Sequence, residues 1–112
     1  RCLQSVRFAD EIVVVDSGST DRTVDIAREC GARVVVTEDW PGFGPQKNRA
    51  LDLAGGEWVL SLDADEWVEP PLADELRACI ASSGGPDAYE LPRSSSFCGR
   101  EMRHSGWWPD YI

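Results

Sequence analysis

Short apolar runs alternate with stretches of helical periodicity along this chain. Each run is short enough for a buried strand, and the three runs are Glu11–Val15, Arg33–Thr37 and Glu57–Leu62. Helical patterns follow them, over about residues 20–30, 45–54 and 70–80. Such alternation predicts parallel strands joined by right-handed crossovers, in an α/β sandwich. Ligands of such sheets gather outside the carboxyl ends of the strands, so the residues after each run are the first candidates for a site.

The remaining stretches complete this order of elements. Residues 1–8 carry the pattern of the last turns of a helix. Pro70-Pro71 opens a helix whose apolar stripe consists of Leu72, Leu76, Cys79 and Ile80. Ser83-Gly84-Gly85-Pro86 is expected to break that helix. Beyond the break we expect a strand over Ala88–Leu91 and one side of a hairpin at Arg100-Glu101-Met102-Arg103.

The third apolar run ends in a cluster of acids. Asp63, Asp65 and Glu66 lie within four residues of one another. Carboxylates this close repel one another unless a cation lies between them, and such oxygen ligands suit Mg²⁺ or Mn²⁺. An EF-hand loop does not fit, because its sixth position would be Val68 rather than glycine. The pattern favours a divalent metal site over the simpler alternative, a solvated turn that leads to the next helix.

The first apolar run also ends in polar residues, Asp16-Ser17-Gly18-Ser19-Thr20-Asp21. Turn formation and helix capping explain Ser19, Thr20 and Asp21. They do not explain Asp16, whose carboxylate ends the strand and can accept a hydrogen bond from the N–H of a planar ring. We therefore expect Asp16 to bind a nucleotide base, at the same edge of the sheet as the acidic cluster.

Two further stretches are candidates for ligand contact. Gln46-Lys47-Asn48-Arg49 lies near the start of a helix. It is either a solvated face or, with the helix N-terminus and two cations, a site for a diphosphate. His104-Ser105-Gly106-Trp107-Trp108-Pro109-Asp110 combines aromatic side chains with one acid. Tryptophan pairs more often pack in cores or interfaces, although indole faces also stack on sugars.

The charge balance limits the class of ligand. Twenty Asp and Glu against eleven Lys and Arg give 112 residues a net charge of −9, which disfavours nucleic acid as a partner. A phosphorylated small ligand is compatible with this charge if a metal supplies positive charge. The four cysteines form no C-x-x-C pair, which disfavours a structural zinc site and indicates a reducing, cytoplasmic compartment. The sequence has no apolar run of about 18 residues, so we expect no transmembrane segment.

Taken together, these motifs resemble the family 2 glycosyltransferases. The order and spacing agree over about residues 1–92, and the matching stretches are Val13–Asp21, Gly44–Leu51 and Gly56–Glu66. The tail from Gly99 to Asp110 is similar to a bacterial subgroup that adds glucose to the inner core of lipopolysaccharide. The resemblance implies the GT-A nucleotide-diphospho-sugar transferase fold. This fold is a three-layer α/β/α sandwich with a mostly parallel sheet, expected here to be truncated at both ends.

The resemblance also implies an inverting transfer of a sugar from a UDP-sugar to a saccharide or lipopolysaccharide-core acceptor. It assigns binding of the uracil to Asp16, and binding of a Mg²⁺ or Mn²⁺ ion to Asp65 together with Asp63. Asp110 is the candidate base for the acceptor hydroxyl. Besides Asp16, the resemblance assigns substrate binding to Ser17, Gly18, Lys47, Arg49, Asp63, Ala64 and Trp107. Asp63 would therefore bind both metal and substrate.

We expect one partial glycosyltransferase domain over residues 1–112. Residues 1–92 would bind the nucleotide-sugar, and residues 93–112 would begin the acceptor side. The family's first strand, with its Pro-x-Tyr-Asn-Glu-like loop, has no counterpart in the sequence, so this piece alone can fold and still lack activity. If the acceptor is a lipid, the expected location is the inner face of the bacterial inner membrane, with peripheral association.

Two other functions would use similar residues. A haloacid-dehalogenase-like phosphohydrolase also places Asp-x-Asp after an apolar strand, with the first Asp as nucleophile. That motif normally continues with a small β-branched residue, whereas this chain has Trp67. A non-catalytic module would hold a nucleotide or sugar without turnover. The intact Asp16, Asp63 and Asp65 argue against such a loss of catalysis.

Overall fold

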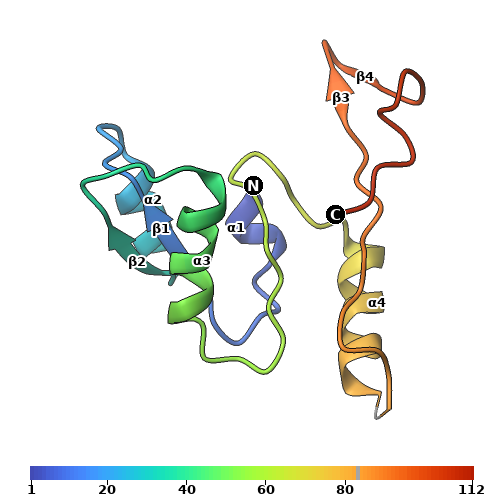
Figure 1. Ribbon diagram of the computed structural model, residues 1–112, viewed down its shortest axis with the longest axis horizontal. Helices are drawn as coiled ribbons and strands as arrows, with labels where there is room; N and C mark the ends of the chain where they lie inside the picture. Colours follow the sequence, from blue (N-terminus) through green and yellow to red (C-terminus); the bar gives the residue numbers. More distant parts are fainter. Residues whose placement is uncertain (83) are drawn as a thin grey trace. The chain divides into compact units, whose positions relative to one another are not determined.

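The computed structural model describes residues 1–82 and 84–112, so Ser83 of the predicted helix break lies outside the described residues. The chain forms two compact units, Arg1–Ala81 and Ser82–Ile112. Unit 1 contains α1 (Cys2–Ser5), β1 (Val13–Asp16), α2 (Thr23–Glu29), β2 (Arg33–Val36), α3 (Phe43–Leu53) and α4 (Pro70–Ala81) (Figure 1). Unit 2 contains β3 (Ser96–Phe97) and β4 (Arg100–Glu101). The functional division after residue 92 stays a prediction, because compactness does not report on ligand binding.

The first two predicted strands pair in parallel, as the alternating pattern indicated. Val13 of β1 lies opposite Arg33 of β2, and Asp16 lies opposite Val36. Both strands therefore end at one edge of the sheet. There the backbone N–H of Thr37 donates to the carbonyl oxygen of Asp16 at 2.8 Å. The loops that follow β1 and β2 thus start side by side. They lie at the carboxyl ends of parallel strands, where ligands of such sheets bind.

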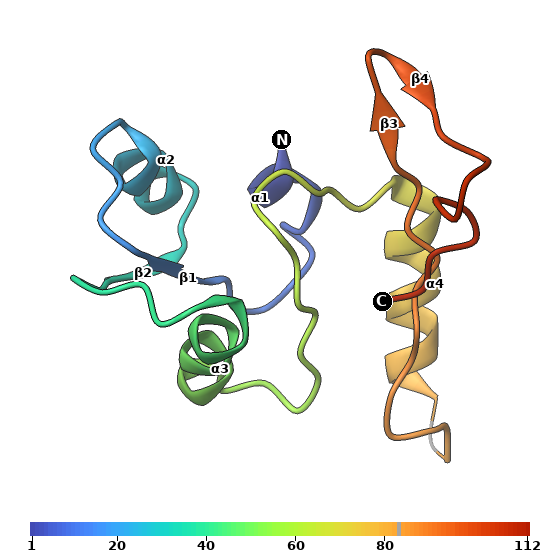
Figure 2. The same cartoon turned by 45° about the horizontal axis from the view of Figure 1, so that its top comes forward.

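Two helices lie on opposite sides of this strand pair. Figure 2 shows α2 on one side of β1 and β2 and α3 on the other. The face of α2 turned to the sheet contains Ala27, which is 2% exposed, and the helix ends before Gly31 at a φ of 86°. A positive φ of this size favours glycine, and α2 lies within the helical pattern predicted over about residues 20–30. A parallel strand pair with a helix on each side is the α/β arrangement that the sequence predicted. The structure shows it for two strands, β1 and β2.

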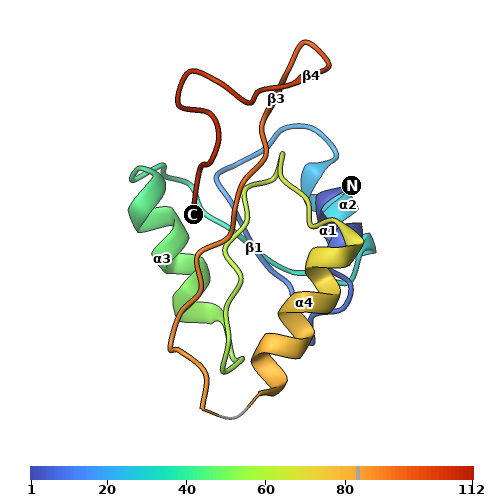
Figure 3. The same cartoon turned by 90° about the vertical axis from the view of Figure 1, so that its right-hand side faces the viewer.

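The third predicted strand, Glu57–Leu62, is wrong. Residues 54–69 run as coil between α3 and α4, and no backbone ladder includes them (Figure 3). Trp58, Val59 and Leu60 are 38%, 50% and 38% exposed. A strand exists only where a neighbour pairs with its backbone. Within the described residues the parallel sheet has only β1 and β2, so the apolar run lacks that neighbour.

The helix predicted to begin at Pro70 is confirmed as α4, and it lies against the first residues of the chain. Ala73 of α4 and the preceding Val68 are 7% and 4% exposed. The guanidinium of Arg77 lies 4.8 Å from the centroid of the Phe8 ring, a cation–π contact. The helix predicted at the start of the chain is confirmed in a shorter form, as α1.

Unit 2 consists of a small hairpin and its flanking chain. β3 and β4 are antiparallel, with Phe97 opposite Arg100, so the predicted hairpin side is confirmed. The strand predicted over Ala88–Leu91 is wrong, because the structure has only an isolated bridge between Pro92 and Tyr111 there. Within the described residues no helix is long and apolar enough to cross a membrane.

Candidate functional site

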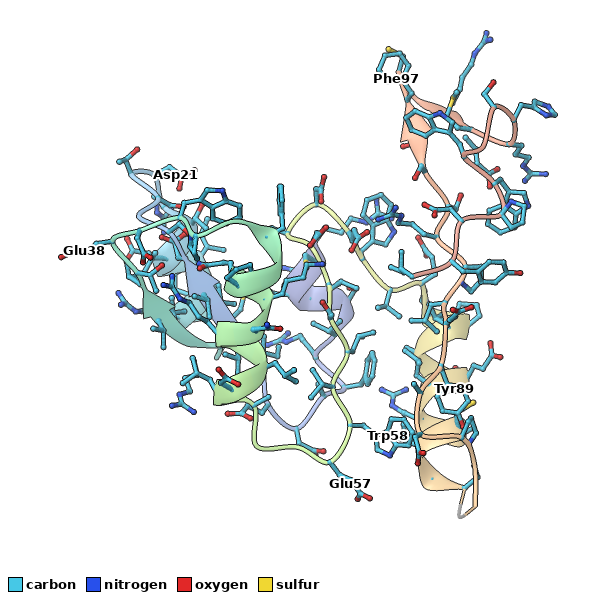
Figure 4. The ribbon with its side chains drawn as sticks, viewed as in Figure 1. Asp21, Glu38, Glu57, Trp58, Tyr89 and Phe97 are labelled. Carbon is cyan, nitrogen blue, oxygen red and sulfur yellow. The ribbon has the colours of Figure 1, made fainter. Side chains whose placement is uncertain are left out.

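Asp16 ends β1 with its carboxylate turned into the loop that follows. Its Oδ1 accepts the backbone N–H groups of Gly18 at 2.8 Å and Ser19 at 2.7 Å, and its Oδ2 accepts the Ser19 hydroxyl. Gly18 has a φ of 91°, which places the loop in a conformation that other residues rarely adopt. Figure 4 shows the side chain of Asp21 farther along, at the outer tip of the loop. Residues 16–19 thus form a tight turn in which Gly18 and Ser19 donate to the buried Asp16 carboxylate.

These hydrogen bonds fix the charge state of Asp16. The Ser19 hydroxyl, and then the backbone N–H groups of Ser19 and Gly18, hold the pKa of this carboxyl below its ordinary value, although burial opposes the shift. Asp16 is only 8% exposed, yet these hydrogen bonds lower its pKa and keep it a carboxylate at neutral pH. A carboxylate has about four acceptor positions, and the loop uses three of them. One acceptor position on Oδ2 is left for a ligand.

The first turns of α3 reach both acidic motifs through consecutive residues. Gln46 donates from Nε2 to Ser17 Oγ at 2.8 Å, in the loop after β1. Lys47 places its Nζ 2.9 Å from Oδ1 of Asp63, in the Asp-x-Asp motif. Two loops that lie 47 residues apart in sequence, counted from Asp16 to Asp63, are therefore tied to one helix turn. The sequence predicted both motifs at one edge of the sheet. That placement is wrong for Asp63, which follows coil rather than a strand, and α3 links the two loops instead.

The Asp-x-Asp motif forms a closed turn. The backbone N–H of Asp63 donates to Glu66 Oε2 at 2.9 Å, and the N–H of Glu66 donates back to the Asp63 carbonyl at 3.0 Å. Glu66 is thus a turn-closing residue. Asp65, at the tip of the turn, has no hydrogen bond or ion pair with any described residue. The turn therefore holds Asp63 against Lys47 at 2.9 Å, while the contact of Asp65 with a ligand stays a prediction.

Helix α1 contacts the Asp-x-Asp turn and the residues after it. The Cys2 thiol lies 3.6 Å from the carbonyl oxygen of Asp63, and Ser5 Oγ accepts the backbone N–H of Val68 at 3.0 Å. Burial, opposed by the adjacent N-terminal charge, raises the pKa of the Cys2 thiol, and the nearby Glu66 and Asp65 raise it further. Cys2 is therefore a neutral thiol that packs beneath the acidic turn, and neither it nor Ser5 carried a signal in the sequence.

The donor set fits a divalent cation only if a ligand completes it. No group of three or more His, Cys, Asp or Glu that could hold a metal occurs in the described part of the chain. Asp65 and Asp63 would supply two carboxylates. Mg²⁺ is commonly bound by one or two carboxylates together with phosphate oxygens and water. The residues present thus fit a metal that arrives with a diphosphate, rather than a cage made by the protein alone.

Arg49 is held one helical turn after Gln46. Its Nη1 and Nη2 donate to the two oxygens of Asp39, at 3.0 and 2.8 Å, and Nη1 also donates to Gln46 Oε1 at 3.0 Å. The guanidinium holds the pKa of Asp39 below its ordinary value. The predicted contact of Arg49 with a donor stays a prediction. In this structure the side chain braces the loop after β2, at whose tip Figure 4 shows Glu38.

Two predicted site residues belong to unit 2. Asp110 Oδ2 accepts both Nε and Nη2 of Arg93, at 2.9 and 2.7 Å, while the Arg93 backbone N–H donates to the Asp110 carbonyl at 2.7 Å. Trp107 is 42% exposed and is bound through its backbone N–H to the carbonyl of His104 at 3.3 Å. Asp110 thus joins two segments of the tail, and its role as a base stays a prediction.

Sequence reasoning included Gln46 in a candidate stretch but missed its burial: it is 8% exposed and bonds Ser17, Thr37 and Arg49 of its own helix. A glutamine beside Lys47, Asn48 and Arg49 is expected on a solvated helical face. The one available signal is position, because Gln46 follows Pro45 in the first turn of a helix, where the chain enters from a loop. Ser17 and Gly18 lie in the loop after β1, as the sequence placed them, whereas Ala64 lies in a turn within coil rather than after a strand. Their contacts with a substrate stay predictions.

Comparison with known proteins places this site in a family context. Residues 1–84 match the family model described as glycosyl transferase family 2. A protein of Rickettsia bellii (strain RML369-C) named an uncharacterized glycosyltransferase is 46% identical over 83 residues, which cover 73% of this chain and 28% of that protein.

Two further relatives carry more specific names. LpsC of Rhizobium meliloti (strain 1021), a lipopolysaccharide core biosynthesis glycosyltransferase, is 34% identical over 103 residues, covering 88% of this chain and 38% of LpsC. The putative glycosyltransferase EpsH of Bacillus subtilis (strain 168) is 31% identical over 83 residues, covering 67% of this chain and 24% of EpsH. The chain thus spans well under half of these relatives. No solved structure matches it significantly.

Proposed function

Because this chain belongs to glycosyl transferase family 2, we propose that it forms the donor-binding part of a glycosyltransferase that uses a UDP-sugar. The observation that carries the proposal is the pair of consecutive contacts from α3. Gln46 holds the loop after β1, and Lys47 holds the Asp-x-Asp turn. A nucleotide-diphosphate sugar has a base at one end and charged phosphates at the other. The loop after β1 offers hydrogen-bond acceptors for the base. The Asp-x-Asp turn offers carboxylates for a cation that would bind the phosphates.

The nucleoside end is proposed to lie at Asp16. Uracil presents a ring N–H between two carbonyl groups, so it needs an acceptor flanked by a donor. Asp16 has one acceptor position left on Oδ2, and it is ionised at neutral pH because its pKa is lowered. The neighbouring Ser17 and Gly18 provide further polar groups in the same loop.

The diphosphate end is proposed to lie at the Asp-x-Asp turn. Asp65 is the direct metal ligand, since Asp63 is already paired with Lys47. A bound Mg²⁺ or Mn²⁺ would stabilise the charge that develops on the leaving diphosphate. Lys47, about half exposed, supplies a second positive charge beside the same phosphates. Arg49, two residues after Lys47, and Ala64, between the two acids, are proposed to contact the same donor.

The acceptor side is proposed to begin in unit 2. In an inverting transfer, a carboxylate removes the proton of the acceptor hydroxyl while that oxygen attacks the anomeric carbon from the face opposite the diphosphate. Asp110 is the candidate for this base, and Trp107 offers an indole face on which a sugar ring can stack. The name of LpsC supports a saccharide of the lipopolysaccharide core as acceptor. Such an acceptor would place the protein in the cytoplasm, at the inner face of the bacterial inner membrane.

The full GT-A sandwich is proposed to need more strands than the described parallel pair. In that three-layer fold Glu57–Leu62 would be a strand, and its apolar side chains would pack between helices. The comparisons favour this transferase over a phosphohydrolase with Asp63 as nucleophile, because the family match includes the Asp-x-Asp motif.

Titration calorimetry of UDP into the full-length protein tests the proposal. Wild type and Asp65→Ala would be compared with Mn²⁺ present and with EDTA. We expect wild-type binding with Mn²⁺, and a loss of at least about tenfold when the metal is removed or Asp65 is replaced. Asp74→Ala, an exposed acid of α4 outside the site, is the matched control and should bind UDP as wild type does.

Equal UDP affinity in EDTA and in Mn²⁺ would remove the metal from the proposal and leave the nucleotide site. Absence of UDP binding under both conditions would overturn the donor site itself. Stoichiometric trapping of a beryllium fluoride complex on Asp63 in the presence of Mg²⁺ would instead support the phosphohydrolase alternative.

A further inference from the structure

Gln46 is one of two buried polar side chains of the described core, and the other is Asp16. A buried amide costs free energy unless each of its polar atoms is hydrogen-bonded. All of them are used here. Nε2 donates to Ser17 Oγ at 2.8 Å and lies 3.4 Å from Thr37 Oγ1, and Oε1 accepts from Arg49 Nη1 at 3.0 Å. The side chain therefore joins the loop after β1, the end of β2 and helix α3.

Arg49 determines which way this amide faces. A guanidinium can only donate hydrogen bonds, so the atom that faces Arg49 must be the carbonyl oxygen Oε1. Arg49 is itself immobilised by its two bonds to Asp39. The NH₂ end of Gln46 must then face Ser17. The direction of the bond between Gln46 and Ser17 follows: the amide donates and the hydroxyl oxygen accepts.

This direction has a consequence for Ser17. Its oxygen is occupied as an acceptor, and its own proton has no acceptor among the described residues. The Ser17 hydroxyl is exposed and is therefore set to donate outward. Beside it, Asp16 keeps one acceptor position on Oδ2. The loop thus presents an acceptor and a donor in adjacent residues.

We propose that Gln46 is a positioning residue that fixes the Ser17 hydroxyl as a hydrogen-bond donor, and that the pair of Asp16 and Ser17 thereby selects uracil over cytosine. The inference rests on the proposed function and specifies the base at that site. Uracil offers its ring N3–H to Asp16 and its adjacent C4 carbonyl to Ser17, whereas cytosine has an amino group at C4. Cytosine at the same place offers an unprotonated ring nitrogen to the carboxylate, so two acceptors face each other, and a buried unpaired acceptor is costly.

Gln46→Glu tests this direction with the least change of shape. The carboxylate is the same size, keeps an acceptor for Arg49, and turns the bond round so that the Ser17 hydroxyl must donate to residue 46. The measurement is the ratio of the dissociation constants of CDP and UDP for the full-length protein, with Mn²⁺ present. The added negative charge weakens both nucleotides alike and cancels in the ratio. We expect the ratio to fall about tenfold, which corresponds to about 1.4 kcal/mol.

Three further variants make the test specific. Gln4→Glu introduces the same charge at an exposed glutamine of α1 and should leave the ratio unchanged. Gln46→Met removes the donor without adding charge, and should lower the ratio as well, so it replaces Gln46→Glu if that variant fails to fold. Ser17→Ala should lower the ratio by itself. In the Ser17→Ala background Gln46→Glu should have no additional effect on the ratio.

A wild-type ratio near one would overturn the inference while leaving a nucleotide site in place. An unchanged ratio in folded Gln46→Glu and Gln46→Met, even with lowered thermal stability, would show that Gln46 is only structural and would also overturn it. If wild type bound neither nucleotide, the proposed function would fail and this inference with it. A ratio that falls in both variants, with no added effect when Ser17 is absent, supports the proposal.

Discussion

At the scale of single residues, the acid at the end of β1 is held in one state by its own loop. Asp16 receives two backbone N–H groups and one hydroxyl, so the loop and the carboxylate stabilise each other. An acid prepared in this way binds a ligand without first losing conformational freedom. Asp21, farther along the same loop, accepts the backbone N–H of Thr23, the first residue of α2, at 2.9 Å. The two acids of one loop thus have separate tasks.

Replacing Asp16 tests that separation. Asp16→Ala should reduce the preference of the full-length protein for UDP over CDP and GDP by about tenfold, because the acceptor for the ring N–H is lost. Its dependence on Mn²⁺ should be unchanged, because the metal is bound at the other loop. Competition titrations measure both quantities. Asp21→Ala, which removes the outer acid of the same loop, is the control and should keep the preference. An unchanged preference in Asp16→Ala would remove the base-binding role.

The same hydrogen bonds make the loop sensitive to acid. Because the pKa of folded Asp16 is lowered by the Ser19 hydroxyl, the unfolded chain binds a proton more readily than the folded one. The stabilisation from Asp16 is therefore present in full above about pH 4, the ordinary Asp range, and is lost as pH falls through the lowered pKa of the folded state. Urea unfolding of wild type and Asp16→Asn between pH 3 and 7 should show a difference that shrinks below pH 4. A difference that grows with acid would contradict this cause.

The cation beside the Asp-x-Asp turn should affect binding more than stability. The pair of Lys47 and Asp63 is about half exposed, and such pairs contribute about 0–1 kcal/mol to folding. Lys47→Gln should therefore shift the free energy of unfolding little, and weaken UDP binding by about tenfold at low salt. Calorimetry at two salt concentrations should also show a weaker salt dependence in the variant. Arg22→Gln, which breaks an exposed pair with Glu29 in α2, is the control and should leave UDP affinity unchanged.

Sequence patterns could locate Asp16, Asp63 and Asp65, because an acid that follows an apolar run stands out locally. They could not locate Gln46 or Ser5. The burial of Gln46 depends on the loop after β1 folding back onto α3, which is a contact between residues 29 apart. Ser5 meets Val68 across 63 residues. Side chains whose role comes only from such distant contacts carry no signal in local patterns.

At the scale of elements, pairing decided which predicted strands formed. β1 and β2 have a partner in each other, so their valine-rich runs became strands. Glu57–Leu62 is also mainly apolar but lacks a neighbouring strand in the described sheet. Predicted helices fared better, since a helix satisfies its own backbone and α4 begins at Pro70 as expected.

Hydrogen exchange distinguishes a segment that lacks a partner from one that cannot form a strand. In the 112-residue chain, the amides of residues 58–62 should exchange within the fastest class, close to the rate of an unstructured peptide. In a longer form of the protein that supplies an additional strand, the same amides should become protected by at least about a hundredfold. The amides of Val14 and Val35 serve as an internal control, because they are paired in β1 and β2 in either form. Fast exchange in both forms would refute a strand at this position.

At the scale of the whole molecule, the chain separates what the proposed reaction needs into two units. Unit 1 holds every element that contacts Asp16, Lys47 and Asp63, whereas Asp110 and Trp107 belong to unit 2. A donor can therefore bind to one unit while the acceptor side is organised by the other. The sequence did not predict where the first compact unit ends, because that limit depends on distant contacts. The backbone N–H of Val68, just before α4, donates to Ser5 Oγ in α1, and Arg77 of α4 lies over the ring of Phe8.

The ion pair of Asp110 with Arg93 allows the two possible roles of Asp110 to be separated. If Asp110 is the base, Asp110→Asn in the full-length protein should lower kcat by about 10²- to 10⁴-fold and leave UDP affinity unchanged. Arg93→Lys keeps a positive charge but not the two bonds to Oδ2, and should lower kcat much less. If Asp110 instead only joins the two tail segments, both variants should destabilise unit 2 and lower kcat to a similar extent.

The pH dependence of kcat provides the second criterion for Asp110. A base that loses its proton in acid gives an acidic limb in the profile of kcat against pH, and this limb should disappear in the residual activity of Asp110→Asn. A structural acid would leave the limb in place, because the group that titrates would still be present elsewhere. Arg103→Lys is the matched control. It alters a comparable pair of bonds, to Glu101 in β4, without touching Asp110, and should keep both kcat and the acidic limb.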